Sequence, residues 1–148
     1  MYTCTFFGHR DAPDAIANTL KEHILYLIEQ KSVHKFYIGN HGHFDFLART
    51  ILAGLKKQYD FIDFYVVLAY LPSKTDEFDL FDYSKTIYPD GIENTPLRFA
   101  IDFRNRWMIE QSNYVITYTI NPCGGASKYK TLSKKKNKIV IELSDIGN

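Results

Sequence analysis

The 148-residue chain lacks the features that mark several large classes of protein. It has only two cysteines, Cys4 and Cys123, which excludes a disulfide framework and a zinc site made of cysteines alone. Charge of one sign is not in excess, because 18 Lys and Arg residues stand against 17 Asp and Glu residues, for a net charge of +1. Duplex nucleic-acid binders carry a strong basic excess, so the composition argues against nucleic acid as a partner.

Long apolar runs and the common nucleotide-binding fingerprints are also missing. No run approaches the ~18 apolar residues of a membrane span, and residues 1–7 have neither the basic nor the long apolar region of a signal peptide. Neither a Walker A loop nor G-x-G-x-x-G occurs. The apolar fraction of 45% is ordinary for a globular protein. We therefore expect a cytoplasmic protein with no membrane partner, folded as a single domain over residues 1–148.

What the chain does contain is an alternation of short apolar runs with amphipathic stretches. The apolar runs predict strands at 3–7, 35–38, 61–71, 114–118 and 139–143, and the helical periods predict helices at 14–30, 44–57, 97–112 and 126–136. Residues 72–96 are predicted to be irregular. This alternation predicts an α/β fold: a Rossmann-like three-layer sandwich with a mainly parallel central sheet of about five strands and helices on both faces.

Glycines and polar residues follow the predicted strands. Gly8-His9-Arg10 follows the first strand, Gly39-Asn40-His41-Gly42 follows the second, and residues 119–127 follow the fourth. In an open parallel sheet these loops meet at the carboxyl edge, where ligands bind at the point at which the strand order reverses. We therefore expect the three segments to converge on one anion-receptive hollow.

Two features near predicted helix starts carry chemistry. Gly124 and Gly125 precede a helix whose free N–H groups favour a phosphate, and Ser127 adds a hydroxyl; the same pair also suits a tight strand-to-helix turn. Asp45 lies at a helix start, where it either caps the helix, holds a ribose hydroxyl, or acts as an acid or base. Three consecutive residues, Arg104-Asn105-Arg106, lie on a predicted helix, and consecutive helix residues point in different directions. One of the two arginines therefore suits phosphate recognition, and the other suits a solvated helix face.

Other candidates have simpler interpretations. His41-Gly42-His43-Phe44-Asp45 resembles the start of a dinuclear-metal hydrolase signature, but all five histidines lie at or before His43, so the later ligands are missing and no metal is expected. Cys123 precedes the diglycine, but neither cysteine has the setting of an established nucleophile. The lysine run at 128–138 is typical of a solvated helix face, with a weak nucleic-acid patch as the alternative.

Several of these motifs occur together in one order. They are Phe6-Phe7-Gly8-His9-Arg10, matching F-x-G-H-R, then Gly42-His43-Phe44-Asp45, then Arg104-Asn105-Arg106-Trp107-Met108, and finally Gly124-Gly125-Ala126. In this combination the chain resembles the SLOG superfamily, the Rossmann-like proteins related to the DNA-processing protein DprA and the LOG (Lonely Guy) hydrolases. The resemblance covers nearly the whole chain and is closer to a bacterial and phage branch known only as a domain of unknown function.

The resemblance implies a SLOG fold that binds a nucleotide or nucleotide-derived small molecule without a cofactor. It implies that the diglycine turn takes a phosphate, that Arg10 or Arg104 neutralises it, and that Asp45 meets a sugar hydroxyl. The resemblance implies that the pocket is lined by Gly8, His9, Arg10, Gly39, Asp45, Arg104, Asn105, Gly124 and Gly125. The neighbouring loop residues Asn40, Gly42 and Ser127 complete the expected ligand-binding set. LOG enzymes carry P-G-G-x-G-T-x-x-E with a catalytic Glu, and residues 122–130 of this chain contain no Glu.

Three functions remain open from the sequence. The first is binding or sensing of a nucleotide-like molecule, in a phage-defence or prophage system. The second is hydrolysis of a nucleotide or its N-glycosidic bond, with Asp45 as the catalytic residue. The third is binding of single-stranded nucleic acid through the lysine run. The resemblance also implies a homodimer.

Overall fold

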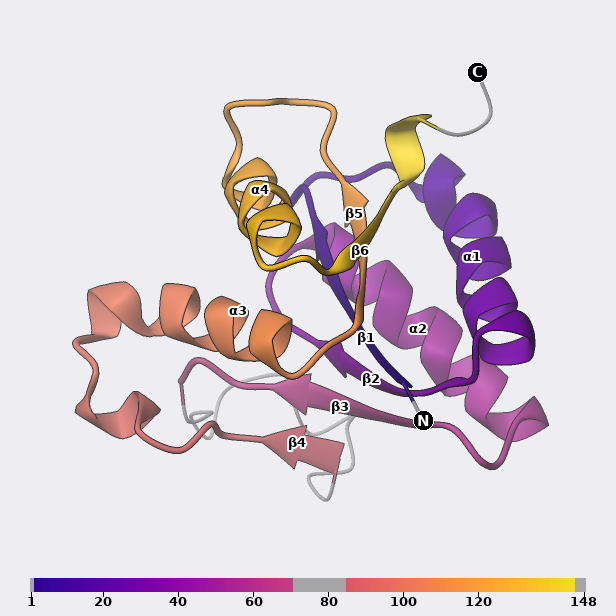
Figure 1. Cartoon of the computed structure of the whole chain (residues 1–148), viewed down its shortest axis with the longest axis horizontal. Coiled ribbons are helices and arrows are strands. Elements are labelled where there is room, and N and C mark those ends of the chain that lie inside the picture. Colours follow the sequence, from indigo (N-terminus) through magenta and orange to yellow (C-terminus); the bar gives the residue numbers. More distant parts are fainter. Residues whose placement is uncertain (1, 71–84, 146–148) are drawn as a thin grey trace.

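The computed structural model describes residues 2–70 and 85–145, and these form one six-stranded sheet in which every pairing is parallel (Figure 1). The strands are β1 (Tyr2–Gly8), β2 (Val33–Ile38), β3 (Asp63–Val67), β4 (Thr86–Ile87), β5 (Tyr114–Tyr118) and β6 (Ile139–Glu142). The α-helices of this part of the chain are α1 (Ala17–Gln30), α2 (His43–Gln58), α3 (Ala100–Glu110) and α4 (Gly125–Lys135). The predicted α/β, Rossmann-like fold class is confirmed.

The strand order is β4-β3-β2-β1-β5-β6. The chain therefore builds outward from β1 to β4, and α3 then returns it to the other side of β1, where β5 and β6 are added. The order reverses between β1 and β5. In an open parallel sheet this reversal opens a crevice at the carboxyl ends of the two strands.

Helices cover both faces of the sheet, as Figure 1 shows. On one face, Leu20 of α1 and Phe44 of α2 belong to the same buried apolar cluster as Phe6 of β1. On the other face, Met108 of α3 belongs to a second cluster with Phe7, the next residue of β1. Because the sheet is covered on both faces, its strands are apolar on both sides, which explains the nearly continuous apolar runs in the sequence.

Two predicted elements differ from the structure. The strand predicted at 61–71 is shorter, because β3 ends at Val67; Leu68 and Ala69 are buried as part of the chain that leaves the sheet, so their apolar character reflects burial and not strand structure. The sheet also has six strands where about five were predicted. The additional strand, β4, lies within the segment predicted to be irregular, and two residues are too few to give a recognisable pattern. Residue 71, the predicted end of that strand, and residues 72–84 lie outside the described part of the chain.

Candidate functional site

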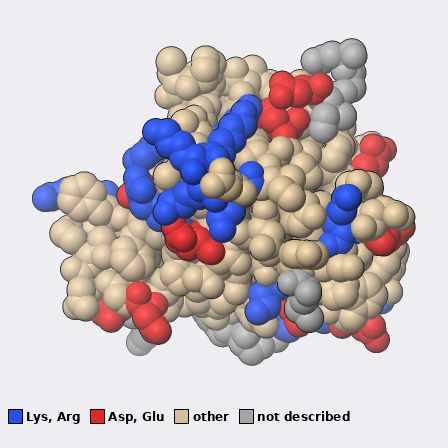
Figure 2. Space-filling model, viewed as in Figure 1, with Lys and Arg blue, Asp and Glu red and all other residues tan. Residues whose placement is uncertain are grey.

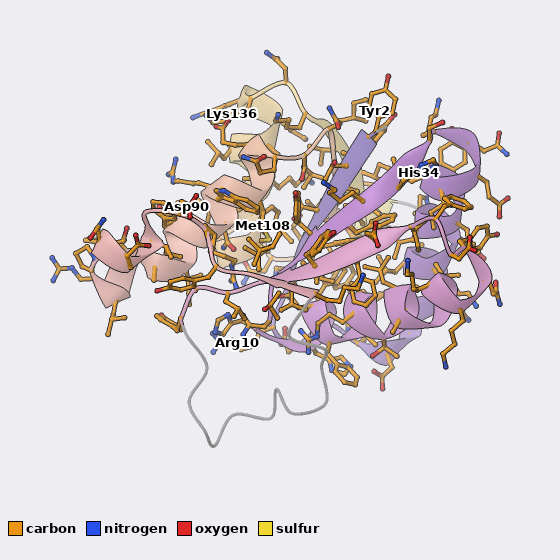
Figure 3. The ribbon with its side chains drawn as sticks, turned by 90° about the horizontal axis from the view of Figure 1, so that it is seen from below. Tyr2, Arg10, His34, Asp90, Met108 and Lys136 are labelled. Carbon is orange, nitrogen blue, oxygen red and sulfur yellow. The ribbon has the colours of Figure 1, made fainter. Side chains whose placement is uncertain are left out.

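A cavity of about 370 Å³ lies at the carboxyl end of β1. Its walls come from the loop after β1, the first turn of α2, the inner side of α3 and the first turn of α4. In Figure 3, Arg10 lies at the end of the sheet opposite to Tyr2 and His34, which lie near the starts of β1 and β2. The cavity therefore occupies the carboxyl edge, beside the point at which the strand order reverses.

The structure brings seven of the twelve predicted ligand-binding residues to the wall of this cavity. They are Gly8, His9, Arg10, Asp45, Arg104, Asn105 and Gly125. The other five, Gly39, Asn40, Gly42, Gly124 and Ser127, do not line it. These five residues contact the lining residues or shape the loops to which the lining residues belong.

Gly39 and Gly42 allow close packing behind the cavity. A Cβ atom at Gly39 would lie 2.7 Å from Oδ2 of Asp45 and 3.1 Å from Nη1 of Arg104. Gly42 has a φ of 91° and a Cβ there would lie 2.8 Å from Cα of Arg10, so both its backbone conformation and its surroundings favour glycine. These two glycines therefore make room for the protein side chains and backbone behind the cavity wall.

The loop between β5 and α4 is organised around Asn121. The backbone N–H of Asn121 donates to Nε2 of His9 at 3.0 Å, and Oδ1 of Asn121 accepts a hydrogen bond from the N–H of Cys123 at 2.9 Å. The hydroxyl of Ser127 donates to the carbonyl of Asn121 at 2.6 Å. A Cβ at Gly124 would lie 3.2 Å from the His9 ring. His9, Gly124 and Ser127 thus position the start of α4.

Arg104 is the most deeply buried charged group of the wall, with an exposed fraction of 3%. Its Nε donates to Oδ1 of Asn105 at 2.8 Å, and its Nη1 donates to Oδ1 of Asn40 at 3.0 Å. The carbonyl of Val67 lies 3.4 Å from the same Nη1. These contacts fix the plane of the guanidinium against the end of the sheet.

Asp45, in the first turn of α2, is also buried, with 8% of its surface exposed. Its Oδ2 accepts a hydrogen bond from the backbone N–H of His41 at 3.1 Å. Burial raises the pKa of Asp45 from 3.8 to about 6, and nearby Arg104, the His41 N–H and Arg49 only partly oppose the rise. A carboxyl group with this pKa exchanges a proton close to neutral pH.

The pKa of His41 reflects the positive charge of the arginines around it. Burial lowers its pKa from 6.5 to about 4, and the positive charges of Arg104, Arg10 and Arg49 contribute to this lowering. Its Nδ1 lies 3.3 Å from Nη1 of Arg104, so the neutral imidazole faces the guanidinium with a lone pair. Three arginines around one carboxylate leave an excess of positive charge, which favours an anionic ligand.

The first turn of α4 adds a second anion-receptive feature. Gly125 and Ala126 line the cavity, and N–H groups in the first turn of a helix have no acceptor within the helix. The positive end of the helix dipole lies at the same place. This is the segment that the sequence predicted as a phosphate site, and the structure brings it to the same cavity as Arg10 and Asp45.

Sequence reasoning missed the apolar part of the wall, which is formed by Phe6, Phe7, Ile101, Met108, Ala126 and Tyr129. The Phe7 and Tyr129 rings are stacked with their centroids 5.3 Å apart, and the Tyr129 hydroxyl donates to Asp102 at 2.8 Å. Tyr129 lies one helical turn after Gly125, and this spacing was the available signal. His41 was expected in one of the converging loops but was not named as a ligand-binding residue.

Other sequence candidates lie elsewhere. Within residues 2–70 and 85–145, no group of three or more His, Cys, Asp or Glu is arranged to hold a metal; His43 instead pairs with Asp14 at 2.5 Å. Cys4 is buried in β1, where burial raises its pKa, and Cys123 is exposed. Over the same residues, no helix has the length and apolar character needed to cross a membrane.

The lysine run forms a basic surface over α4 (Figure 2). Three of its six lysines pair with acidic residues: Lys128 with Asp102 at 3.2 Å, Lys130 with Glu142 at 3.0 Å, and Lys136 with Glu110. Half of the run is therefore neutralised within the protein, as in a solvated helix face.

Models of known protein families match no part of the chain, and a search of curated proteins returns no match.

Proposed function

We propose that the chain is a SLOG-like protein that binds a nucleotide or nucleotide-derived small molecule in the cavity at the carboxyl edge of its sheet. The observation that carries this proposal is that Arg10, Asp45, Arg104 and Gly125, from four separate segments, line one cavity of about 370 Å³. The motifs shared with the SLOG superfamily support the same function.

Each part of a nucleotide has a matching part of the wall. The phosphate fits the first turn of α4 and the Arg10 guanidinium, which supply N–H donors and positive charge. The base fits the apolar wall around Phe7, Met108 and Tyr129. Because small-molecule sites span about 300–1,000 Å³, this cavity is at the small end and suits one nucleotide unit.

Hydrolysis of the nucleotide is the second candidate, favoured by one observation. Asp45 has a pKa of about 6, which suits a general acid or base near neutral pH. In this case Asp45 would act on the bond between base and sugar.

The experiment combines thermal unfolding with product analysis. The purified protein is incubated with AMP, GMP, CMP and UMP, its melting temperature is measured, and the mixtures are analysed by mass spectrometry. Binding without turnover predicts a raised melting temperature and no new products. Products that disappear in Asp45→Asn would instead identify the hydrolase.

Matched arginine variants test the site itself. Arg10→Gln changes an exposed side chain of the wall and is expected to remove most of the shift. Arg106→Gln is the control, because Arg106 lies on α3 next to Arg104 but pairs with Asp102 outside the cavity. If no nucleotide raises the melting temperature, or if the two variants behave alike, the proposal is wrong.

A further inference from the structure

Asp45 and Arg104 approach each other over Gly39 without forming an ion pair. Oδ2 of Asp45 and Nη1 of Arg104 lie 2.7 and 3.1 Å from the position of a Cβ at Gly39, which puts them less than about 6 Å apart. Among the described residues, however, no ion pair within 4.0 Å joins the two side chains. At this separation the two groups lie close together but are too far apart for a direct hydrogen bond.

Each of the two side chains also has one polar atom without a hydrogen-bond partner in the described part of the chain. Nε and Nη1 of Arg104 bind protein acceptors, whereas Nη2 has no hydrogen-bond partner within residues 2–70 and 85–145. Oδ2 of Asp45 accepts the His41 N–H, and in the same part of the chain Oδ1 has no donor. Both buried residues line the cavity, so a ligand there meets one residue with an unused donor and one with an unused acceptor.

A hydroxyl group has the chemistry that this pair requires. It donates to a carboxylate oxygen at about 2.7 Å and accepts from a guanidinium N–H at about 2.9 Å, so it supplies both the donor that Oδ1 of Asp45 lacks and the acceptor that Nη2 of Arg104 lacks. A phosphate dianion has no proton to donate and is repelled by the carboxylate. The phosphate therefore belongs at the α4 end of the cavity and a hydroxyl-bearing part of the ligand at the Asp45 end.

We infer that Asp45 and Arg104 read the vicinal diol of a ribose, so that the protein selects ribonucleotides over deoxyribonucleotides. This inference rests on the proposed function, because it takes a nucleotide as the ligand. It adds the sugar specificity and assigns it to two residues. Gly39 is required because any side chain there would enter the space that both groups share.

The test compares binding of ribonucleoside 5′-monophosphates with that of their 2′-deoxy and 3′-deoxy analogues by calorimetry. The wild-type protein is expected to bind the ribose form at least about tenfold more tightly than either analogue, since a buried polar pair is left without its partner when a hydroxyl is missing. In Asp45→Asn the ratio should fall to within about threefold, while binding of the deoxy form is retained.

Glycine variants provide a matched second measurement. Gly39→Ala is expected to reduce the ribose preference, because its methyl group displaces the Asp45–Arg104 pair. Gly54→Ala is the control, since no atom lies within 4 Å of a Cβ there and the preference should be unchanged. Equal binding of ribose and deoxyribose forms by wild-type protein, with both lost in Arg10→Gln, would overturn this inference and leave the proposed function standing. Failure of every nucleotide to bind would overturn both.

Discussion

Replacing Asp45 with asparagine is expected to stabilise the protein without ligand at pH 8. Burial raises the pKa of the carboxyl group from 3.8 to about 6, so holding it ionised in the folded state costs about 3 kcal/mol, at about 1.4 kcal/mol for each pKa unit. Asparagine has the same shape, accepts the His41 N–H with its carbonyl oxygen and carries no charge. The free energy of unfolding should therefore rise by up to about 3 kcal/mol.

The pH dependence gives the sign of the effect. Because the folded pKa of Asp45 lies above its unfolded value, the folded state holds the proton more tightly, and this contribution to stability is lost as the pH rises from about 4 to about 6. Asparagine does not titrate, so its advantage over the wild type should be largest at pH 8 and should vanish near pH 4. Urea unfolding followed by circular dichroism at pH 4, 6 and 8 measures it.

An exposed aspartate supplies the control. Asp60 lies just after α2 and is exposed, so Asp60→Asn should change the free energy of unfolding by no more than about 0.5 kcal/mol at any of these pH values. A loss of 1 kcal/mol or more in Asp45→Asn at pH 8 would show that Asp45 serves chiefly to stabilise the start of α2, and the reasoning above would be refuted.

Three further predictions concern a glycine, a buried carboxylate and the two cysteines. Gly8→Ala should lower the free energy of unfolding by about 1–3 kcal/mol in urea titrations, because its Cβ would lie 2.2 Å from the buried Phe44 ring; an unchanged midpoint would contradict this packing. Glu142→Gln should lose about 2–4 kcal/mol at pH 7, and the loss should shrink between pH 4.5 and about 2, where the wild-type carboxylate takes up a proton. A thiol reagent should modify Cys123 alone in the folded protein and also Cys4 in urea; rapid labelling of both would place Cys4 outside the core.

The fold was predictable because its cause is local and repeated. Strands covered on both faces need continuous apolar runs, and helices covered on one face need apolar residues at a period of about 3.6 residues. Both patterns can be recognised in the sequence. The end of β3 was not predictable, because Leu68 and Ala69 are buried although they lie beyond the last residue of the strand, so the apolar run continues past it. β4 is held by only two paired residues and gives no periodic signal.

The site was predictable in position but not in detail. Loops that follow parallel strands must meet at one edge, so Arg10, Asp45 and the diglycine were expected together, and they line or adjoin one cavity. The sequence does not show what a glycine makes room for. A Cβ at Gly39 would crowd Asp45 and Arg104, and a Cβ at Gly124 would crowd His9, and no sequence pattern predicts these neighbours. Such distances depend on the folded chain as a whole.

Two buried carboxylates show why charge alone does not identify a site. Glu142 accepts hydrogen bonds from Thr117, Thr119 and Ser144 and pairs with Lys130, and its hydrogen bonds lower its pKa to about 2 against the opposing effect of burial. Asp45 is equally buried but accepts one backbone N–H, and its pKa rises to about 6. The Glu142 carboxylate thus has protein partners for its oxygens and stabilises the fold. The second carboxylate has the raised pKa and the place in a cavity wall that are typical of functional carboxylates, so Asp45 is the residue at which the function of this protein is to be tested.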